Sequence, residues 1–172
     1  MNNSLTIRFA KPEEAKDIYE MIRASFLDYI KYTNNTGIAP ALKDTIEDVQ
    51  KVVNANKVML LLDDDEAVGS LRCDINGEFA YIGRVCILPQ YRKRGYGTLI
   101  MHKAEDYCQK EGVKCLALHT TTHNVPLIRF YLNLGFIVHS TTTDRGYIRV
   151  LLIKPLTDDL DFKNIPEFVL AK

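Results

Sequence analysis

The segment that decides the fold lies in the middle of the chain, where an apolar strand leads into a helix that begins with glycines. It reads Val85-Cys86-Ile87-Leu88-Pro89-Gln90-Tyr91-Arg92-Lys93-Arg94-Gly95-Tyr96-Gly97-Thr98. Backbone N–H groups in the first turn of a helix lack partners within the helix and lie at the positive end of its dipole. Gly95 and Gly97 carry no side chain that would keep a phosphate away from these groups. The segment therefore has the physical properties of a pyrophosphate-binding loop.

Two commoner phosphate-binding loops do not fit this segment. A Walker loop requires Gly-Lys-Ser/Thr after four spacer residues, and that sequence is absent. A dinucleotide-binding fingerprint requires a third glycine three residues after Gly97, where Ile100 stands. Taken alone, the glycines and the cations Arg92, Lys93 and Arg94 fit a solvated basic turn equally well. The surrounding sequence must therefore decide between the two interpretations.

Hydrophobic patterning on both sides of the segment predicts a series of strands and helices. Strands are expected over residues 5–10, 58–62, 67–75, 79–88, 113–119, 136–140 and 147–154, and helices over 11–30, 45–55, 96–109 and 125–134. Asn76-Gly77 is a strong hairpin signal, and residues 34–40 are expected to form a loop. This order predicts an α/β fold with a mixed, mostly antiparallel twisted sheet flanked by helices.

The domain organisation follows from the same pattern. Residues 1–155 are expected to form a single domain, without an internal repeat or a linker. The C-terminal tail, residues 156–172, has no pattern that predicts its packing. It is expected to pack either on the domain or on a second subunit, and a homodimer through the last strand and the tail is one arrangement to consider.

Composition excludes several classes of protein. Lys plus Arg and Asp plus Glu both number 22, so no general field favours nucleic acid or an anionic membrane. No apolar run is long enough to span a bilayer, and the N-terminus does not resemble a signal peptide. The four cysteines form no CxxC pair, which predicts reduced core thiols in a cytoplasmic protein without a metal site. They are Cys73, Cys86, Cys108 and Cys115.

Two motifs together resemble those of the GNAT N-acetyltransferase superfamily. In that family an apolar strand leads through Arg/Gln-x-x-Gly-x-Gly/Ala into a helix, and here the chain reads Arg92-x-x-Gly95-x-Gly97. The family's second motif is Asn-x-x-Ala-x-x-x-Tyr-x-x-x-Gly-Phe. Here it reads Asn124-Val125-Pro126-Leu127-Ile128-Arg129-Phe130-Tyr131-Leu132-Asn133-Leu134-Gly135-Phe136, with Leu127 in place of the usual small residue. The order of strands and helices is also similar to the family's, so the resemblance covers nearly all of the chain except the tail.

The resemblance implies that acetyl-CoA is the cosubstrate and that the amine attacks it directly, without an acyl-enzyme. Backbone groups of Val85, Cys86 and Ile87 would bind the pantetheine arm as an added strand does, with the Ile87 N–H as a single oxyanion donor. Asn124 would contact the cofactor arm, and Tyr131 would protonate the leaving thiolate. The pyrophosphate would be held by N–H groups of Arg92, Lys93, Arg94, Gly95, Tyr96, Gly97 and Thr98.

Several of these residues also have a purely structural interpretation. Asn124 is also suited to cap the helix that Pro126 begins, and Tyr131 also fits a core aromatic at helical spacing. Cys86 suggests a covalent intermediate, but a buried thiol without a base beside it in sequence is a poor nucleophile. His119 and His123 are further candidates to line the site, although a lone histidine is more often structural.

The general base is where the chain departs from the family pattern. Histone-type members carry a Glu midway along the strand before the cofactor loop, and Tyr81 occupies that position here. A phenol with its usual pKa near 10 is a weak base at neutral pH. Glu78, three residues earlier, is therefore the candidate base from the sequence, and it would act through a water; the alternative is an amine substrate that arrives already neutral.

Two functions follow as hypotheses. The first is acetyl transfer to a primary amine of a small molecule, a peptide or a protein. The alternative is a non-catalytic acyl-CoA-binding regulatory domain. The acceptor would be selected by the two N-terminal helices and by the loops at residues 34–42 and around Asp144. Acids such as Glu20, Asp28 and Asp44 are candidates to attract a cationic amine.

Overall fold

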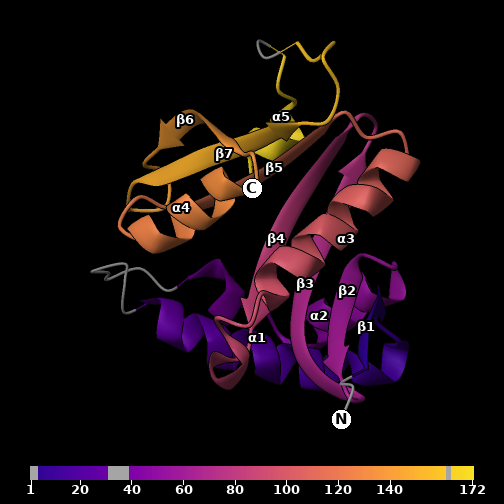
Figure 1. The fold of residues 1–172 in the computed structure, drawn as a ribbon. Helices are drawn as coiled ribbons and strands as arrows, with labels where there is room; N and C mark the ends of the chain where they lie inside the picture. Colours follow the sequence, from indigo (N-terminus) through magenta and orange to yellow (C-terminus); the bar gives the residue numbers. More distant parts are fainter. Residues whose placement is uncertain (1–3, 31–38, 162–163) are drawn as a thin grey trace.

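The computed structural model describes residues 4–30, 39–161 and 164–172, and in these ranges the strands form one sheet (Figure 1). The spatial order is β1-β2-β3-β4-β5-β7-β6. The strands are β1 (Leu5–Phe9), β2 (Val58–Asp63), β3 (Glu66–Asn76), β4 (Phe79–Ile87), β5 (Cys115–Thr121), β6 (Ile137–Thr142) and β7 (Arg149–Pro155). The pair β4 and β5 is parallel, and the other neighbours are antiparallel. The predicted fold class is confirmed.

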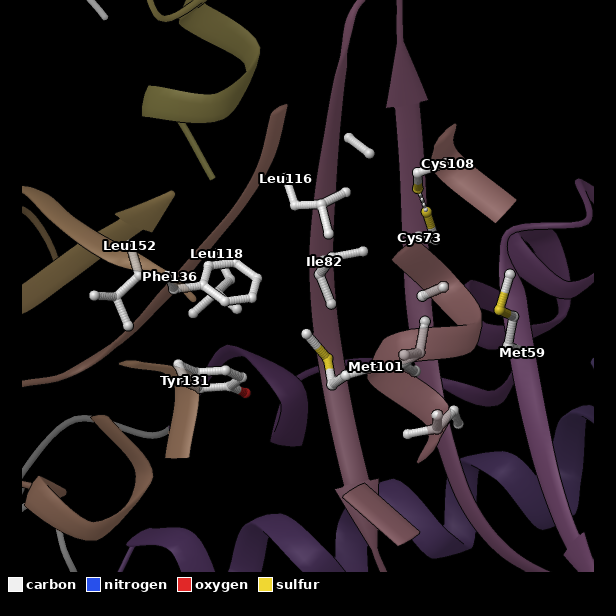
Figure 2. Packing of buried hydrophobic residues seen from close by; sticks show 14 of the residues in the cluster. Met59, Cys73, Ile82, Met101, Cys108, Leu116, Leu118, Tyr131, Phe136 and Leu152 are labelled. Carbon is white, nitrogen blue, oxygen red and sulfur yellow. Dashed lines mark hydrogen bonds between the residues drawn. The ribbon is translucent and has the colours of Figure 1, made fainter. Parts of the chain in front are cut away.

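Helices cover both faces of this sheet. They are α1 (Ala15–Tyr29), α2 (Ile46–Asn54), α3 (Tyr96–Lys110), α4 (Val125–Asn133) and α5 (Glu167–Leu170). Side chains alternate between the faces along each strand, so Leu61 packs with α3 while Leu60 packs with α1 and α2. The core under α3 and α4 includes Ile82, Leu118 and Leu152 (Figure 2).

Two strands begin later than predicted, because the residues before them still form hydrogen bonds that end the preceding helix. The strand predicted from Val113 begins at Cys115, because the Val113 N–H returns to the Cys108 carbonyl and closes α3. The strand predicted from Phe136 begins at Ile137, because the Phe136 N–H still bonds the Tyr131 carbonyl at the end of α4. The strand predicted from residue 147 begins two residues later, at 149. Of the loop predicted over 34–40, residues 34–38 lie outside the described residues.

The tail packs on its own sheet. Ile165 and Val169 are buried against Cys115 and Leu151, on the face opposite α3. The Lys172 ammonium also pairs with Asp74 of β3 at 2.8 Å. Of the two arrangements expected for the tail, packing on the domain is the one that the described residues adopt.

Core packing under α3 makes a direct prediction for stability. Ile100 is fully buried, whereas its neighbour Leu99 is 42% exposed. Ile100→Ala is expected to lower the free energy of unfolding by about 2–5 kcal/mol, since it removes buried methyl groups and leaves a cavity. Leu99→Ala is the matched control and should cost about 0.5 kcal/mol or less. Equilibrium urea denaturation measures both, and equal losses would contradict this description of the core.

Candidate active site

The centre of the site is the place where β4 and β5 separate. The strands pair in parallel from Phe79 and Cys115 to Tyr81 and Ala117, and these are their last paired positions in the part of the chain described. Beyond them β4 carries a bulge, where Arg84 has a φ of 52° and the register with β3 shifts. A bulge bends its strand. The second half of β4 therefore presents backbone groups to a gap, where an extended ligand can pair with them.

A pocket of about 590 Å³ lies in this gap, a volume typical of small-molecule sites. It is lined by α1, β4, the loop before α3, the first turn of α3, β5 and α4. The predicted site residues in its lining are Val85, Cys86, Ile87, Arg92, Lys93, Gly95, Tyr96, Gly97, Thr98, Asn124 and Tyr131. Segments far apart in sequence thus meet around one cavity.

The start of α3 fits an anion through its two glycines. Gly95 is the N-cap and has a φ of 83°, a backbone conformation that favours glycine. A Cβ on Gly97 would lie 3.3 Å from Cζ of Phe130, so the missing side chain lets α3 approach α4. Both glycines line the pocket, and the unpaired N–H groups of this first turn suit a pyrophosphate.

The basic side chains of the loop before α3 differ in their partners and in whether they line the pocket. Arg92 forms an ion pair with Asp28 of α1 and donates from Nε to the Ile87 carbonyl at 3.1 Å. Arg94 lies outside the pocket lining and stacks on Tyr91, with 5.0 Å from its guanidinium carbon to the ring centroid. An anion in the pocket would therefore meet Lys93 and compete with Asp28 for Arg92.

Asn124 and Tyr131 both face the pocket from α4 and the turn before it. The Asn124 side-chain oxygen accepts from the Leu127 N–H at 3.2 Å, which confirms the predicted helix cap. Asn124 also lines the pocket, so the cap and a cofactor contact are compatible. Capping fixes the start of α4 and with it the position of Tyr131, about two turns further along the helix.

Tyr131 is a buried phenol with an aromatic environment. Its ring centroid lies 5.1 Å from that of Phe130 and 5.7 Å from that of Phe136. Figure 2 shows its hydroxyl directed away from α4, on the side of β4. Burial raises the pKa of Tyr131 above its usual value. The hydroxyl therefore keeps its proton at neutral pH and is able to donate it.

Cys86 has the environment of an inert thiol. Its Sγ lies 3.2 Å from the Ser70 hydroxyl, and burial raises the pKa of the thiol. A protonated thiol is a poor nucleophile. This environment agrees with direct attack by the amine and not with an acetyl-cysteine intermediate.

Replacing Cys86 tests that conclusion. Cys86→Ala is expected to keep kcat for acetyl transfer close to the wild-type value, because the thiol takes no part in the chemistry. Steady-state kinetics measure kcat, and mass spectrometry of the quenched enzyme should detect no acetylated protein. Loss of turnover together with an acetyl group trapped on the wild-type cysteine would contradict the direct mechanism.

Glu78, the base predicted from the sequence, lies at the turn between β3 and β4. Its carboxylate is 2.9 Å from Nζ of Lys114, and its backbone carbonyl accepts from the N–H groups of Lys114 and Cys115. The turn is at the opposite end of β4 from the loop that enters α3. The structure therefore does not bring Glu78 to the pocket with the other predicted residues.

The sequence assigned the N-terminal helices and Asp28 to the acceptor, but it did not predict that α1 forms a wall of this pocket. Phe26, Asp28 and Tyr29 line the pocket, and the Tyr29 hydroxyl accepts from the Thr121 N–H at 3.0 Å. The helical spacing of Phe26 and Tyr29 had indicated an ordinary buried face. This face of α1 borders a cavity only because β4 separates from β5, and no local sequence pattern predicts that separation.

The part of the chain that the structure describes offers neither a metal-binding cluster nor a membrane-spanning helix. These residues contain no cluster of three or more His, Cys, Asp or Glu side chains that could hold a metal ion. None of their helices combines the length and apolar character needed to cross a bilayer.

The arrangement expected of an acyltransferase that uses CoA is present in outline: β4 and β5 separate, α3 begins with glycines at the pocket, and the buried phenol of Tyr131 lines the same pocket. The sequence model of the Acetyltransferase (GNAT) family matches residues 16–136. The chain belongs to this family, as its two motifs predicted, and is an acetyltransferase whose cosubstrate is acetyl-CoA.

The chain is also similar to individual proteins and solved structures. The uncharacterised protein YyaT of Bacillus subtilis strain 168 is 30% identical over 103 residues, which cover 59% of this chain and 68% of that protein. Streptothricin acetyltransferase A of the same strain is 28% identical over 142 residues, covering 78% and 82%. The crystal structure of PaiA N-acetyltransferase from Thermoplasma acidophilum in complex with coenzyme A has a TM-score of 0.74 at 18% identity, covering 88% of this chain and 99% of that one. The last similarity shows a shared fold.

Proposed function

We propose that the chain moves the acetyl group of acetyl-CoA directly to a primary amine of a small molecule, a peptide or a protein. The observation that carries the proposal is the pocket between β4 and β5, whose wall combines the start of α3 with Tyr131. The buried, protonated Tyr131 favours an enzyme over a non-catalytic acyl-CoA-binding domain, since binding alone requires no proton donor at this place.

The proposed roles follow the pocket from one end to the other. First-turn N–H groups of α3 and the preceding loop hold the pyrophosphate, with charge from Lys93. The free edge of β4 from Val85 to Ile87 pairs with the pantetheine arm, and Asn124 borders the arm from α4. Tyr131 donates its proton to the departing thiolate. Each role uses a group that lines the one cavity.

The acceptor side is formed by α1 and by the face of the sheet opposite α3. The carboxylates expected to attract a cationic amine already have partners here, since Asp44 accepts from Arg84 at 2.7 and 2.9 Å and Asp28 pairs with Arg92. Because each of these carboxylates is already paired with an arginine, they attract a polycationic amine only weakly. A neutral or singly charged amine fits these surroundings better.

An amine panel tests the function directly. Wild-type enzyme and acetyl-CoA are incubated with small amines, amino acids, peptides with free N-termini, lysine peptides and streptothricin, the substrate named for one relative. Release of free CoA and mass spectrometry of the amine measure transfer. We expect at least one primary amine to be acetylated. Tight CoA binding without transfer to any amine would support the non-catalytic domain instead.

The oligomeric state of the protein and its cellular compartment are also proposals. A homodimer would form through the last strand, β7, and the tail, together with the neighbouring edge strand β6, where Ile137 and Val138 are exposed. Sedimentation equilibrium measures the mass in solution. Residence in the cytoplasm stays a prediction from the reduced cysteines.

A further inference from the structure

The proposed function leaves open which chemical class of primary amine the enzyme accepts. We propose that the acceptor is an amino acid, a small amine that bears a carboxylate, and that Arg84 of β4 binds this carboxylate. The assignment rests on the proposed acetyl transfer and narrows it to one substrate class. It gives a role to a guanidinium that lines the pocket but lies outside the loop proposed to hold the pyrophosphate.

The bulge of β4 brings Arg84 to the face of the sheet opposite α3, where the acceptor would bind. Residues two apart on a regular strand point to the same face. Ile82 packs under α3, whereas Arg84 contacts Asp44 and lines a small cavity beside α1 and α2. The change of face follows from the extra residue of the bulge and from the left-handed φ of Arg84, 52°. A backbone conformation that is costly for a residue other than glycine thus places a charged side chain at the opening in the sheet.

Arg84 also lies near the place where the thioester would be. CoA would enter the free edge of β4 from the start of α3, and its arm would pass Ile87 before Val85. Because pyrophosphate and thioester are at opposite ends of the arm, the thioester end comes closest to Arg84, which precedes Val85 and lines the same pocket. In an α-amino acid a single carbon separates the amine from the carboxylate. A carboxylate bound at Arg84 therefore holds the amine close to the carbon that it attacks.

The Arg84 guanidinium is oriented by one carboxylate and has donors left for a second. Its Nε and Nη2 donate to the two Asp44 oxygens at 2.7 and 2.9 Å. A guanidinium carries its N–H donors in a planar fork that matches carboxylates, and Nη1 of Arg84 has no hydrogen-bond partner in the part of the chain described. The side chain is 26% exposed. The edge formed by Nη1 and Nη2 is therefore available to a ligand, in an orientation that Asp44 fixes before binding.

The charges around this position also favour an anionic group. Burial raises the pKa of Tyr81 on the same strand, whereas the positive charges of three nearby guanidinium groups lower it, namely those of Arg149, Arg84 and Arg145. Among the described residues, Asp44 pairs with Arg84, and Asp144 is shared between Arg149 and Arg145. The acceptor face therefore keeps a surplus of positive charge, which attracts a carboxylate and repels a polycationic amine.

The rest of the pocket supplies a surface for the remainder of an amino acid. Among the described residues of the lining, Arg84 is the single guanidinium or ammonium outside the loop before α3. Phe26 and Tyr29 of α1 line the pocket as well, with their ring centroids 5.5 Å apart. These rings are able to pack against an amino-acid side chain. One charged anchor beside an aromatic wall is the arrangement that a small zwitterion requires.

Matched pairs of acceptors test the inference on the wild-type enzyme. The common amino acids and their carboxamides are each incubated with acetyl-CoA, and release of CoA gives kcat/KM. Conversion of the carboxylate to an amide lowers the pKa of the amine, which by itself favours the amide. We expect at least one amino acid to exceed its amide by about tenfold or more in kcat/KM, since hydrogen bonds to a charged group are lost with the carboxylate. Equal or higher values for the amides overturn the inference.

Two variants separate contact with Arg84 from general charge. Arg84→Gln keeps a long polar side chain that is able to bond Asp44, but it removes the guanidinium. It should lower kcat/KM for the amino acid about 10–100-fold and so remove the preference for the acid over the amide. Arg72→Gln is the matched control, because Arg72 lies opposite Gly83 on β3, is 31% exposed and is outside the pocket lining. It should keep the preference, and calorimetric titration with acetyl-CoA checks that both variants retain the cofactor site.

The possible outcomes distinguish this inference from the proposed function. A retained preference in Arg84→Gln, or an equal loss in Arg72→Gln, overturns the role of Arg84. If Arg84→Gln does not fold, the comparison of acids with amides on the wild type still decides. Transfer by the wild type to amines without a carboxylate, and not to amino acids, removes this inference alone. Absence of transfer to any amine, with acetyl-CoA bound, removes the proposed function and the inference with it.

Discussion

Tyr131→Phe is expected to lower kcat for acetyl transfer by about 10²–10⁴-fold, the usual contribution of a positioned general acid. The change removes one hydroxyl and keeps the ring, so packing against Phe130 and Phe136 is preserved. Burial raises the pKa of Tyr131, and the hydroxyl is therefore protonated when the thiolate forms. Because the lost interaction belongs to the transition state, the affinity for acetyl-CoA should stay near the wild-type value.

The measurement combines stopped assays of CoA release with calorimetric titration of acetyl-CoA. Tyr107→Phe is the matched control, because Tyr107 is partly buried on α3 against the Phe9 ring and lies outside the pocket lining. It should leave kcat unchanged. If Tyr131→Phe turned over as fast as Tyr107→Phe, Tyr131 would be a core aromatic and another group would protonate the thiolate.

Substitution of Gly97 is expected to have the second large effect, on affinity. A Cβ at this position lies 3.3 Å from Cζ of Phe130, in the wall that faces the pocket. Gly97→Ala requires a small movement of the Phe130 ring. Gly97→Val adds two further methyl groups beside the Phe130 ring and is expected to narrow the pocket at the start of α3. The valine variant should lose at least about tenfold in acetyl-CoA affinity, equivalent to about 1.4 kcal/mol, and the alanine variant less.

Calorimetric titration with acetyl-CoA measures this series. Leu99→Val is the matched control, since it puts the same β-branched residue into the first turns of α3 at a position that is 42% exposed. It should keep wild-type affinity, with only the small cost that valine has in a helix. Equal affinity in Gly97→Val and the wild type would mean that the pyrophosphate lies elsewhere.

The cofactor side of the site could be predicted from the sequence because its chemistry is local. Gly95 and Gly97 lie within one turn, and an anion at a helix start needs only that turn. The second motif placed Asn124 and Tyr131 on one short helix in the same way. Helical and strand periodicities predicted most of the remaining elements to within two residues, because most of these strands and helices bury at least one face.

The acceptor side could not be predicted, because it depends on contacts between distant segments. Tyr81 and His119 meet only through the parallel register of β4 with β5. The pairing of Arg92 with Asp28 joins the phosphate loop to α1. Glu78 was selected by proximity in sequence along β4, whereas the turn directs it toward Lys114. Such contacts carry no periodic signal in the chain.

The most direct test of the account is a crystal structure of the chain with CoA bound. Pyrophosphate oxygens are expected at hydrogen-bonding distance, about 3 Å, from N–H groups between Arg92 and Thr98. The pantetheine arm is expected beside Val85 to Ile87, with the sulfur next to the Tyr131 hydroxyl. CoA bound at another surface, with the gap between β4 and β5 left empty, would contradict this placement.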